Sequence, residues 1–124
     1  MKNLIYIFPI LVLVLLWAFR GSTSVIDGDT FVQDGKYYRL EGIDSPEKGN
    51  KCYNLAKKAL EKELRDLESI VPKGYDKYDR QVVKLLDSNY QDINKRLLST
   101  GYYKPRYTKT YMKETYKYNP KCTY

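Results

Sequence analysis

Short β-type segments alternate with tight turns just after an apolar N-terminus, which restricts the fold to a sheet built from hairpins. The segments 24–26 and 30–32 flank Asp27-Gly28-Asp29, and a second Asp-Gly pair follows at 34–35. Asp-Gly readily takes the positive φ angles that a type I′ hairpin turn requires. Residues 37–43 alternate between apolar and polar side chains well enough to predict a third strand.

Two helical patterns and further strand patterns occupy the rest of the chain. Apolar residues at helical spacing predict one helix from a cap at Asn54 to about Leu67, and a second from Asp92 to Thr100 that Gly101 stops. We expect short strands at Ile70-Val71 and 81–86, with a turn at Pro72-Lys73-Gly74 between them. This order of elements predicts an α+β, mainly β fold: a small antiparallel barrel with two packed helices.

The N-terminus carries an uncharged run, Leu4–Phe19, with Lys2 before it and Arg20 after it. The run is slightly long for the apolar region of a signal peptide and slightly short for a membrane span. We therefore expect residues 1–20 to form a hydrophobic helix that is either a cleaved signal peptide or a membrane anchor, with association through residues 4–19. Both alternatives place the rest of the chain outside the cytosol, secreted or held at the membrane.

The 124 residues include 22 lysines and arginines, 15 acidic residues and no histidine. The missing histidine excludes serine–histidine triads, cysteine–histidine pairs and histidine-based metal sites. The net charge of +7 lies wholly in residues 95–124, where eight basic residues face only Glu114, and where seven tyrosines also lie. Bases stack on aromatic rings and lysines follow phosphates, so this basic, tyrosine-rich tail favours a nucleic-acid partner. The alternatives are tyrosines packed on the barrel and a tail that contacts anionic lipid.

Two cysteines, Cys52 and Cys122, are too few for a four-cysteine zinc site. Export would place them in an oxidising compartment, where an isolated pair is often a disulfide. The sequence does not show that the two side chains meet, so the bridge stays open.

Three separated motifs concentrate side chains that can carry chemistry. They are VIDGDT at 25–30, RLEGIDSPE at 39–47 and DKYDR at 76–80, and the helix DINKRLLSTG follows at 92–101. Singly, each motif has a plain structural explanation as a turn, a strand exit or a weak surface ion pair. Together and in this order they closely resemble the staphylococcal-nuclease-like thermonuclease family over roughly residues 24–107. The resemblance implies an OB-fold, a five-stranded antiparallel barrel with two helices, over residues 21–107, followed by a tail at 108–124; we expect a monomer.

The resemblance also implies a role for each matching residue. These roles are calcium binding by Asp29, Asp44 and the backbone carbonyl of Ser45, catalysis by Arg39, Glu47 and Arg80, and substrate binding by Tyr78, with Lys77, Tyr102 and Tyr103 as further candidates. Within catalysis, the two arginines would hold the scissile phosphate and the glutamate would act as general base.

Elementary chemistry agrees with these roles. Negative charge develops on the phosphate during hydrolysis, and two planar guanidinium groups suit its oxygens better than ammonium groups do. An all-oxygen ligand set without histidine favours Ca²⁺ over Zn²⁺. A carboxylate beside the ion can accept a proton without an imidazole.

Two departures from the family pattern concern stability and activity. Asp79 stands where the family commonly has glycine, so its carboxylate could pair with Arg80 or change the turn. The family's C-terminal helix is absent, and its place is taken by residues 107–124.

The sequence predicts a calcium-dependent nuclease that cleaves DNA, RNA or both with little sequence preference. A catalytically inactive nucleic-acid-binding OB-fold module, in one form anchored to a membrane, is the alternative.

Overall fold

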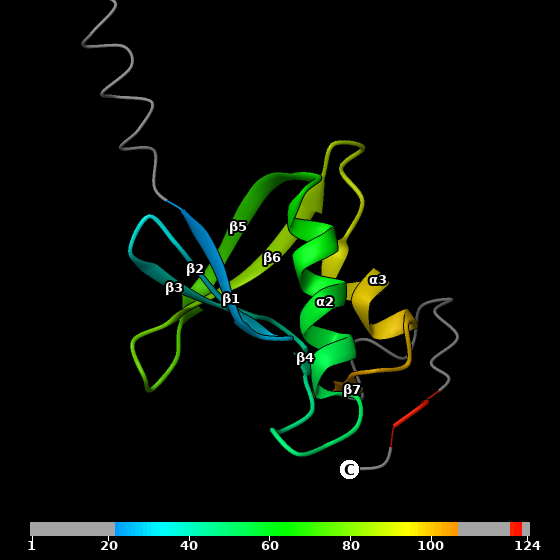
Figure 1. The fold of residues 1–124 in the computed structure, drawn as a ribbon. Helices are drawn as coiled ribbons and strands as arrows, with labels where there is room; N and C mark the ends of the chain where they lie inside the picture. Colours follow the sequence, from blue (N-terminus) through cyan, green and yellow to red (C-terminus); the bar gives the residue numbers. More distant parts are fainter. Residues whose placement is uncertain (1–21, 107–119, 123–124) are drawn as a thin grey trace, which may run out of the picture.

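The computed structural model describes residues 22–106 and 120–122. The fold is α+β with sheet predominating, and its elements are β1 (Thr23–Asp27), β2 (Thr30–Gln33), β3 (Lys36–Leu40), β4 (Ile43–Asp44), α2 (Tyr53–Leu64), β5 (Leu67–Tyr75), β6 (Gln81–Asp87), α3 (Ile93–Ser99) and β7 (Lys104–Pro105) (Figure 1). No helix in the described part of the chain is long and apolar enough to cross a membrane. The segment predicted as a signal peptide or anchor, residues 1–20, lies outside the described residues, as does most of the tail predicted at 108–124.

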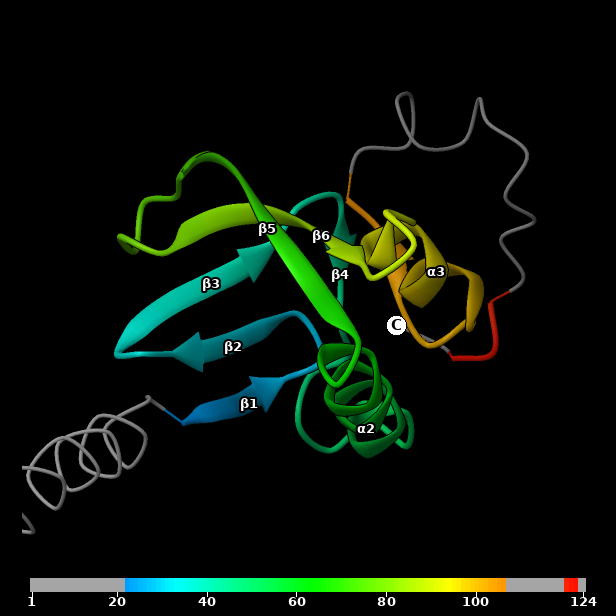
Figure 2. The same cartoon turned by 90° about the horizontal axis from the view of Figure 1, so that it is seen from above.

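The main sheet has the strand order β1-β2-β3-β6-β5, and it curls around the core as Figure 2 shows. Two hairpins place β1, β2 and β3 antiparallel, and β5 pairs antiparallel with β6. The prediction of an all-antiparallel barrel is wrong, because β3 and β6 run parallel. A parallel pair needs a long crossover, and the chain from β4 through α2 and β5 supplies it. Among the described strands the sheet stays open between β1 and β5, while β4 pairs with β7 in a separate small sheet.

The helices and the fifth strand differ from the predicted boundaries in ways that local chemistry explains. The first helix begins at Tyr53 after the N-cap residue Cys52, so Asn54 lies inside the helix and is not its cap. The predicted turn at Pro72-Lys73-Gly74 is part of β5, where the pairing register shifts between Pro72 and Gly74. Proline and glycine are tolerated there because a bulge on an edge strand does not need every N–H for pairing.

The second helix agrees with its prediction. The side chain of Asp92 caps α3 by accepting a hydrogen bond from the backbone N–H of Lys95. Gly101 follows the helix with a φ of 84°, the left-handed conformation that glycine adopts without strain.

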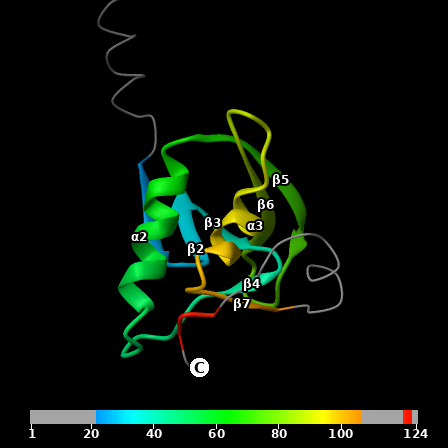
Figure 3. The same cartoon turned by 90° about the vertical axis from the view of Figure 1, so that its right-hand side faces the viewer.

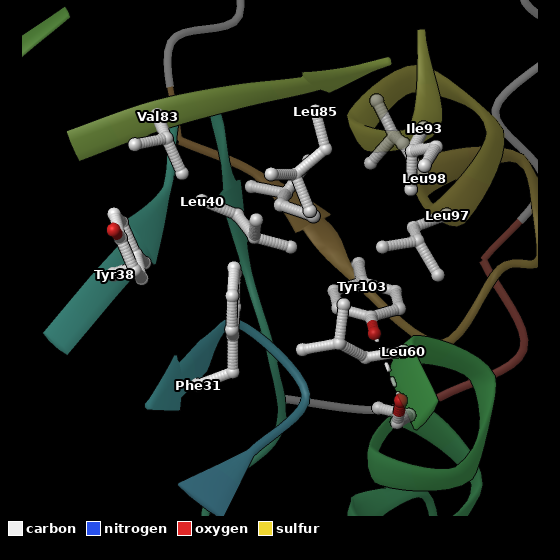
Figure 4. Close-up of a cluster of buried hydrophobic side chains, with 12 residues drawn as sticks. Phe31, Tyr38, Leu40, Leu60, Val83, Leu85, Ile93, Leu97, Leu98 and Tyr103 are labelled. Atoms are coloured by element: carbon white, nitrogen blue, oxygen red, sulfur yellow. Dashed lines mark hydrogen bonds between the residues drawn. The ribbon is translucent and has the colours of Figure 1, made fainter. Parts of the chain in front are cut away.

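The hydrophobic core fills the space between the curled sheet and the two helices. In Figure 3, α2 stands beside β1 and α3 lies beside β6. Figure 4 shows side chains from the sheet and from both helices meeting around Leu40, Leu60 and Leu97, all buried. The ring of Phe31 stacks on that of Tyr38 with centroids 5.1 Å apart.

Tyr103 belongs to this core, which corrects its prediction as a substrate-binding residue. Figure 4 shows Tyr103 among the core side chains, where it is fully buried. Its hydroxyl lies 2.7 Å from the carbonyl oxygen of Gly28 and 2.9 Å from that of Ala56. A ring with no exposed face cannot stack on a base. Its hydroxyl instead ties the β1–β2 turn to the first turn of α2.

Polar contacts attach α3 to the rest of the domain. The buried amide of Asn94 donates to the carbonyl oxygens of Glu41 and Val83, each at 3.0 Å, and accepts from the N–H of Leu85. The guanidinium of Arg96 donates to the carboxylates of Glu63 on α2, at 2.6 Å, and of Asp87 on β6, at 2.7 Å. One side chain thus links α3 to both of its neighbours.

We expect the Asp87→Asn variant to be less stable than the parent at pH 7, and the difference to narrow in acid. The backbone N–H of Gln91 and the guanidinium of Arg96 hold the pKa of Asp87 below its ordinary value of 3.8. A carboxyl group whose pKa is lowered by folding stabilises the protein above pH 3.8, and this contribution disappears as the pH falls through the folded-state pKa. Urea unfolding at pH 7 and well below pH 3.8 measures both differences.

The matched control is Asp34→Asn on the exposed β2–β3 turn, which should leave the urea midpoint unchanged at either pH. A difference between Asp87→Asn and the parent that stays the same at both pH values would contradict this account.

Candidate active site

One pocket of about 580 Å³ collects side chains from all three sequence motifs. It is lined by Ile26, Asp27, Asp29, Arg39, Asp44, Ser45, Pro46, Glu47, Lys48, Tyr53, Arg80 and Lys104. Every predicted catalytic and metal-binding residue is therefore in this one pocket. A second pocket, of about 510 Å³ between β1 and α2, contains none of the predicted site residues.

Strand pairing explains why distant motifs meet here. Arg39 on β3 is paired with Thr30 on β2 and with Val82 on β6. Arg80 precedes Val82 by two residues, so it lies near the same point of the sheet. Asp29 directly precedes Thr30 in the β1–β2 turn, so its carboxylate also lies close to Arg39 on β3. The register of two hairpins and one parallel pair brings the three motifs together.

The guanidinium of Arg39 occupies the centre of the site, and its side chain is only 5% exposed. Its Nη1 atom donates to the carbonyl oxygens of Leu40, at 2.6 Å, and Ile43, at 2.7 Å. Its Nη2 atom donates to Oδ1 of Asp44 and lies 3.4 Å from Oδ2 of Asp29. A single nitrogen thus contacts both carboxylates that the sequence predicts as metal ligands, so these two carboxylates are close neighbours.

Asp29 is held in a fixed orientation by further hydrogen bonds. Its Oδ2 atom accepts from the backbone N–H of Ser45 at 2.8 Å, and its Oδ1 atom accepts from the Thr30 hydroxyl at 3.0 Å. Burial alone would raise the pKa of this carboxyl group, but the charge of Arg39 and the hydrogen bonds lower it below 3.8. The neighbouring Asp27 behaves in the opposite way, since burial and the proximity of Asp29 raise its pKa to about 6. Asp29 is therefore ionised at neutral pH.

These groups fit a hard divalent cation. No cluster of three or more histidine, cysteine or acidic side chains suited to a metal occurs among residues 22–106 and 120–122. Two neighbouring carboxylates, Asp29 and Asp44, with a main-chain carbonyl at Ser45 would still give an all-oxygen set, which calcium prefers to complete with water. The lowered pKa of Asp29 also suits metal binding, because a carboxyl group must be deprotonated to act as a metal ligand.

The third motif forms a tight turn in which Asp76 holds Arg80. The carboxylate of Asp76 accepts from the backbone N–H groups of Tyr78 and Arg80 and from Nε of Arg80, at 2.8–2.9 Å. Nη1 of Arg80 lies 3.3 Å from the Thr30 hydroxyl, which orients the guanidinium toward the Arg39 side of the site. The carboxylate that pairs with Arg80 is therefore that of Asp76. Asp79 adopts a φ of 63°, the left-handed conformation that a glycine would take at this position of the turn.

The predicted substrate-binding residues divide between the surface and the core. Tyr78 is 67% exposed, and its ring lies 5.1 Å from the Lys77 ammonium and 5.3 Å from the Arg80 guanidinium carbon. Tyr102 is half-buried, with the Lys121 ammonium 5.7 Å from its ring centroid. Tyr78 and Lys77 thus stay beside the site at Arg80, whereas Tyr103 is buried in the core.

Three pocket residues lie outside the three sequence motifs and were not predicted. Lys104 on β7 lies opposite Asp44 on β4, and Tyr53 at the start of α2 donates to the carbonyl oxygen of Ile26 at 3.2 Å. Only Lys48 had a visible signal, since it directly follows Glu47. The other two depend on the pairing of two-residue strands and on the position of a helix end, which local sequence does not encode.

Cys52 and Cys122, whose pairing the sequence leaves open, form a disulfide with their Cα atoms 6.1 Å apart and a sequence separation of 70. The bond attaches the last described residues to the start of α2. It lies at the end of the loop that carries Glu47.

We expect Gly28→Ala to disturb the site through sterics. A Cβ atom on Gly28 would lie 2.7 Å from Cβ of Ala56 and 2.8 Å from Cβ of Ser45. Separating these groups should lower the free energy of unfolding by about 1–3 kcal/mol and weaken calcium binding, because the Ser45–Asp29 hydrogen bond spans the same contact. Urea unfolding and a calcium titration measure the two effects.

Adding Ala56→Gly to this variant removes one of the two clashes, so part of the lost stability should return despite a cost of about 1 kcal/mol for glycine in a helix. A Gly28→Ala protein as stable as the parent would show that the contact is not tight.

Replacing Asp79 by glycine should stabilise the domain by up to about 1 kcal/mol, because glycine adopts a positive φ without the steric cost of a Cβ atom. Asp79→Ala is the matched control and should lower stability, since alanine keeps the Cβ atom but lacks the short polar side chain that helps aspartate adopt a positive φ. Thermal unfolding of both variants tests this pair. Equal effects of glycine and alanine would mean that backbone strain at Asp79 is negligible.

Comparison with known proteins gives one finding. A family model described as staphylococcal nuclease homologue matches residues 37–122, more than half of the chain. The match includes Arg39, Asp44, Glu47 and Arg80, while the turn with Asp29 precedes it and is brought to the site by the fold. No curated protein matches the chain. Since the matched segment contains most of the pocket and extends to the last described residue, the chain belongs to the staphylococcal nuclease homologue family.

Proposed function

We propose that this protein is a calcium-dependent nuclease that hydrolyses phosphodiester bonds of DNA, RNA or both. The observation that carries the proposal is the contact of one buried guanidinium, that of Arg39, with both Asp29 and Asp44 in a pocket that Glu47 and Arg80 also line. A fold that only needed to bind nucleic acid would have no use for two neighbouring acidic side chains in its binding pocket, because negative charge repels phosphate. Membership of a family of nuclease hydrolases supports the same function.

Each pocket residue has a task in this reaction. Arg80 would bind the phosphate oxygens, on which negative charge increases as water attacks. Arg39 would join it when a phosphate oxygen replaces one of the carboxylate contacts of its Nη2 atom. Asp76 and Thr30 would keep the Arg80 guanidinium in place, so little of its orientation is left to be fixed when substrate binds. Glu47, exposed at the pocket edge, would accept the proton that the attacking water releases.

Calcium would be held by Asp29, Asp44 and the carbonyl of Ser45, and when bound it would neutralise charge on the phosphate and help orient the water. Tyr78 and Lys77, on the turn beside Arg80, would contact the neighbouring nucleotide, with Tyr102 as a further candidate. Low sequence specificity follows from contacts to phosphate and to ring faces, since neither distinguishes one base from another.

The direct test is digestion of single- and double-stranded DNA and RNA by the purified protein, with calcium and with a chelator. We expect cleavage with calcium alone, and Glu47→Gln should lower kcat by about 10²–10⁴-fold, the usual contribution of a general base. Binding of an uncleavable oligonucleotide by Glu47→Gln should match the parent.

If no nucleic acid is cleaved in calcium while oligonucleotides still bind, the protein is the non-catalytic binding module instead. We place that alternative behind the nuclease because Asp29, Asp44 and Glu47 share one pocket with Arg39 and Arg80, and because the N–H of Ser45 orients the Asp29 carboxylate there.

We also propose that the domain works outside the cytosol, exported or anchored through residues 1–20. The Cys52–Cys122 disulfide supports this location, because such bonds persist in oxidising compartments and are rare in the cytosol. N-terminal sequencing of the exported protein would distinguish a cleaved signal from an anchor.

The position of Lys104 opposite Asp44 leads to a prediction about binding. If its ammonium contacts a substrate phosphate, Lys104→Gln should weaken oligonucleotide binding and reduce the slope of log affinity against log salt by about one. Fluorescence anisotropy across a salt series, with chelator present to prevent cleavage, measures the slope. Lys36→Gln, an exposed change on β3 that does not line the pocket, is the control. A slope that is unchanged in Lys104→Gln would remove this residue from the binding surface.

A further inference from the structure

Glu47 lies on a loop that is firmly attached at its start. The loop follows Asp44, and the backbone N–H of Ser45 donates to Asp29. The next side chain, Pro46, is fully buried. From Glu47 to Gly49 the chain is exposed, and Gly49 takes a φ of 94° as the chain reverses. The proposed general base is therefore the first residue beyond the buried attachment.

A series of short hydrogen bonds continues from Glu47 to the start of α2. The backbone N–H of Asn50 donates to the carbonyl oxygen of Glu47 at 3.1 Å. The side-chain oxygen of Asn50 accepts from the N–H of Cys52 at 2.9 Å, and its carbonyl oxygen accepts from the N–H of Tyr53 at 3.0 Å. The far end of the loop is thus connected to Cys52 and Tyr53, so restraints on these two residues also restrain the loop.

Ordinary helix capping does not fix Cys52. It is the N-cap residue of α2, yet it makes no side-chain capping hydrogen bond, and the first turn of the helix contains no acidic residue. The N-cap side chain therefore adds neither the hydrogen bond nor the negative charge that often stabilises a helix start, and Asn50 accepts from the N–H groups of Cys52 and Tyr53 instead. The restraint on the Cys52 side chain is its bond to Cys122.

Cys122 can act as an anchor because the residues around it are attached to the core. The N–H of Lys121 donates to the carbonyl oxygen of Gly101 at 2.9 Å, and the Lys121 ammonium lies over the ring of Tyr102. The next residue, Tyr103, is tied by its hydroxyl to Gly28 and Ala56. Both sulfur-bearing residues are buried, Cys52 at 2% and Cys122 at 9% exposure. The disulfide therefore connects the Glu47 loop to the same core that supports the Asp29 turn.

We infer that the Cys52–Cys122 disulfide is a positioning device for Glu47, so that the activity of the enzyme depends on the oxidation of this bond. The inference rests on the proposed nuclease function for its kinetic consequence, while its structural consequence can be measured without activity. Reduction adds two electrons and two protons from a dithiol, converts the bond to two thiols and removes the covalent restraint on the end of the loop. Arg39, Asp29 and Asp44 keep their own contacts, so substrate binding is retained.

The test compares the parent, the Cys52→Ala/Cys122→Ala variant and the parent reduced with dithiothreitol, all at a temperature where urea unfolding shows each to be folded. We expect kcat to fall about 10- to 100-fold, the range that a displacement of about 1 Å costs a catalytic group, with KM changed less than twofold. In a Glu47→Gln background, removing the disulfide should cause no further loss of kcat, because the group it positions is already absent.

Asp87→Asn serves as the control for lost stability alone, since it weakens the fold away from the loop and should leave kcat unchanged. Hydrogen exchange gives the second readout: after reduction, the amides of residues 47–53 should exchange faster while those of β2 and β3 do not. If the parent does not cleave nucleic acid, the proposed function fails and the exchange pattern alone decides the inference.

Unchanged exchange in residues 47–53 would overturn the inference in every case. In an active enzyme, so would an equal fall in kcat on disulfide removal with and without Glu47. Loss of kcat that Asp87→Asn reproduces at matched stability would also overturn it.

Discussion

The buried guanidinium of Arg39 is the interaction on which the site depends. A charge taken out of water is costly unless it is paired and its donors are all used. Here the donors reach two carbonyl oxygens at the end of β3 and β4 and two carboxylates from different motifs. The β1–β2 turn and the β3–β4 corner are therefore held to each other by a single side chain, and removing it would leave Asp29 and Asp44 without their shared partner.

Close packing around Arg39 connects the β1–β2 turn to α2 and to the loop that begins at Ser45. Gly28 allows the β1–β2 turn to touch both α2 and the Ser45 loop, and Tyr103 bonds to the turn and the helix from the core side. The disulfide brings residues 120–122 against Gly101 and Cys52. The side chain of Cys52, the N-cap residue of α2, makes no capping hydrogen bond, and it is restrained by its covalent bond to Cys122.

The sequence predicted which residues share a pocket better than it predicted the sheet. Asp29, Arg39, Asp44, Glu47 and Arg80 could be identified because each occurs in a motif that the family resemblance covers, and all five line one pocket. The parallel pairing of β3 with β6 could not be read from alternating residues, because alternation gives a strand its faces but not its neighbour. Pro72 and Gly74 imitate a turn locally, although pairing with β6 keeps them in a strand.

Tyr103 shows the same limit for side chains. Composition placed it among tyrosines suited to bases, whereas two carbonyl oxygens and a gap in the core determine where its ring lies. Lys104 was missed for the opposite reason, since only the pairing of β4 with β7 brings it to Asp44. The net charge of the chain also did not indicate where the site lies. The excess of basic residues is in residues 95–124, whereas the site is built around Arg39 and the carboxylates of Asp29 and Asp44.

Calorimetry of calcium binding, with and without an uncleavable phosphorothioate oligonucleotide, tests most directly whether ion and phosphodiester meet at the Arg39 centre. If they do, the oligonucleotide should tighten calcium binding about tenfold or more, as reciprocal coupling between adjacent sites requires. Asp44→Asn should abolish this coupling. Calcium affinity that is the same with and without the oligonucleotide, or coupling that survives Asp44→Asn, would contradict the assignment of this pocket as the catalytic site.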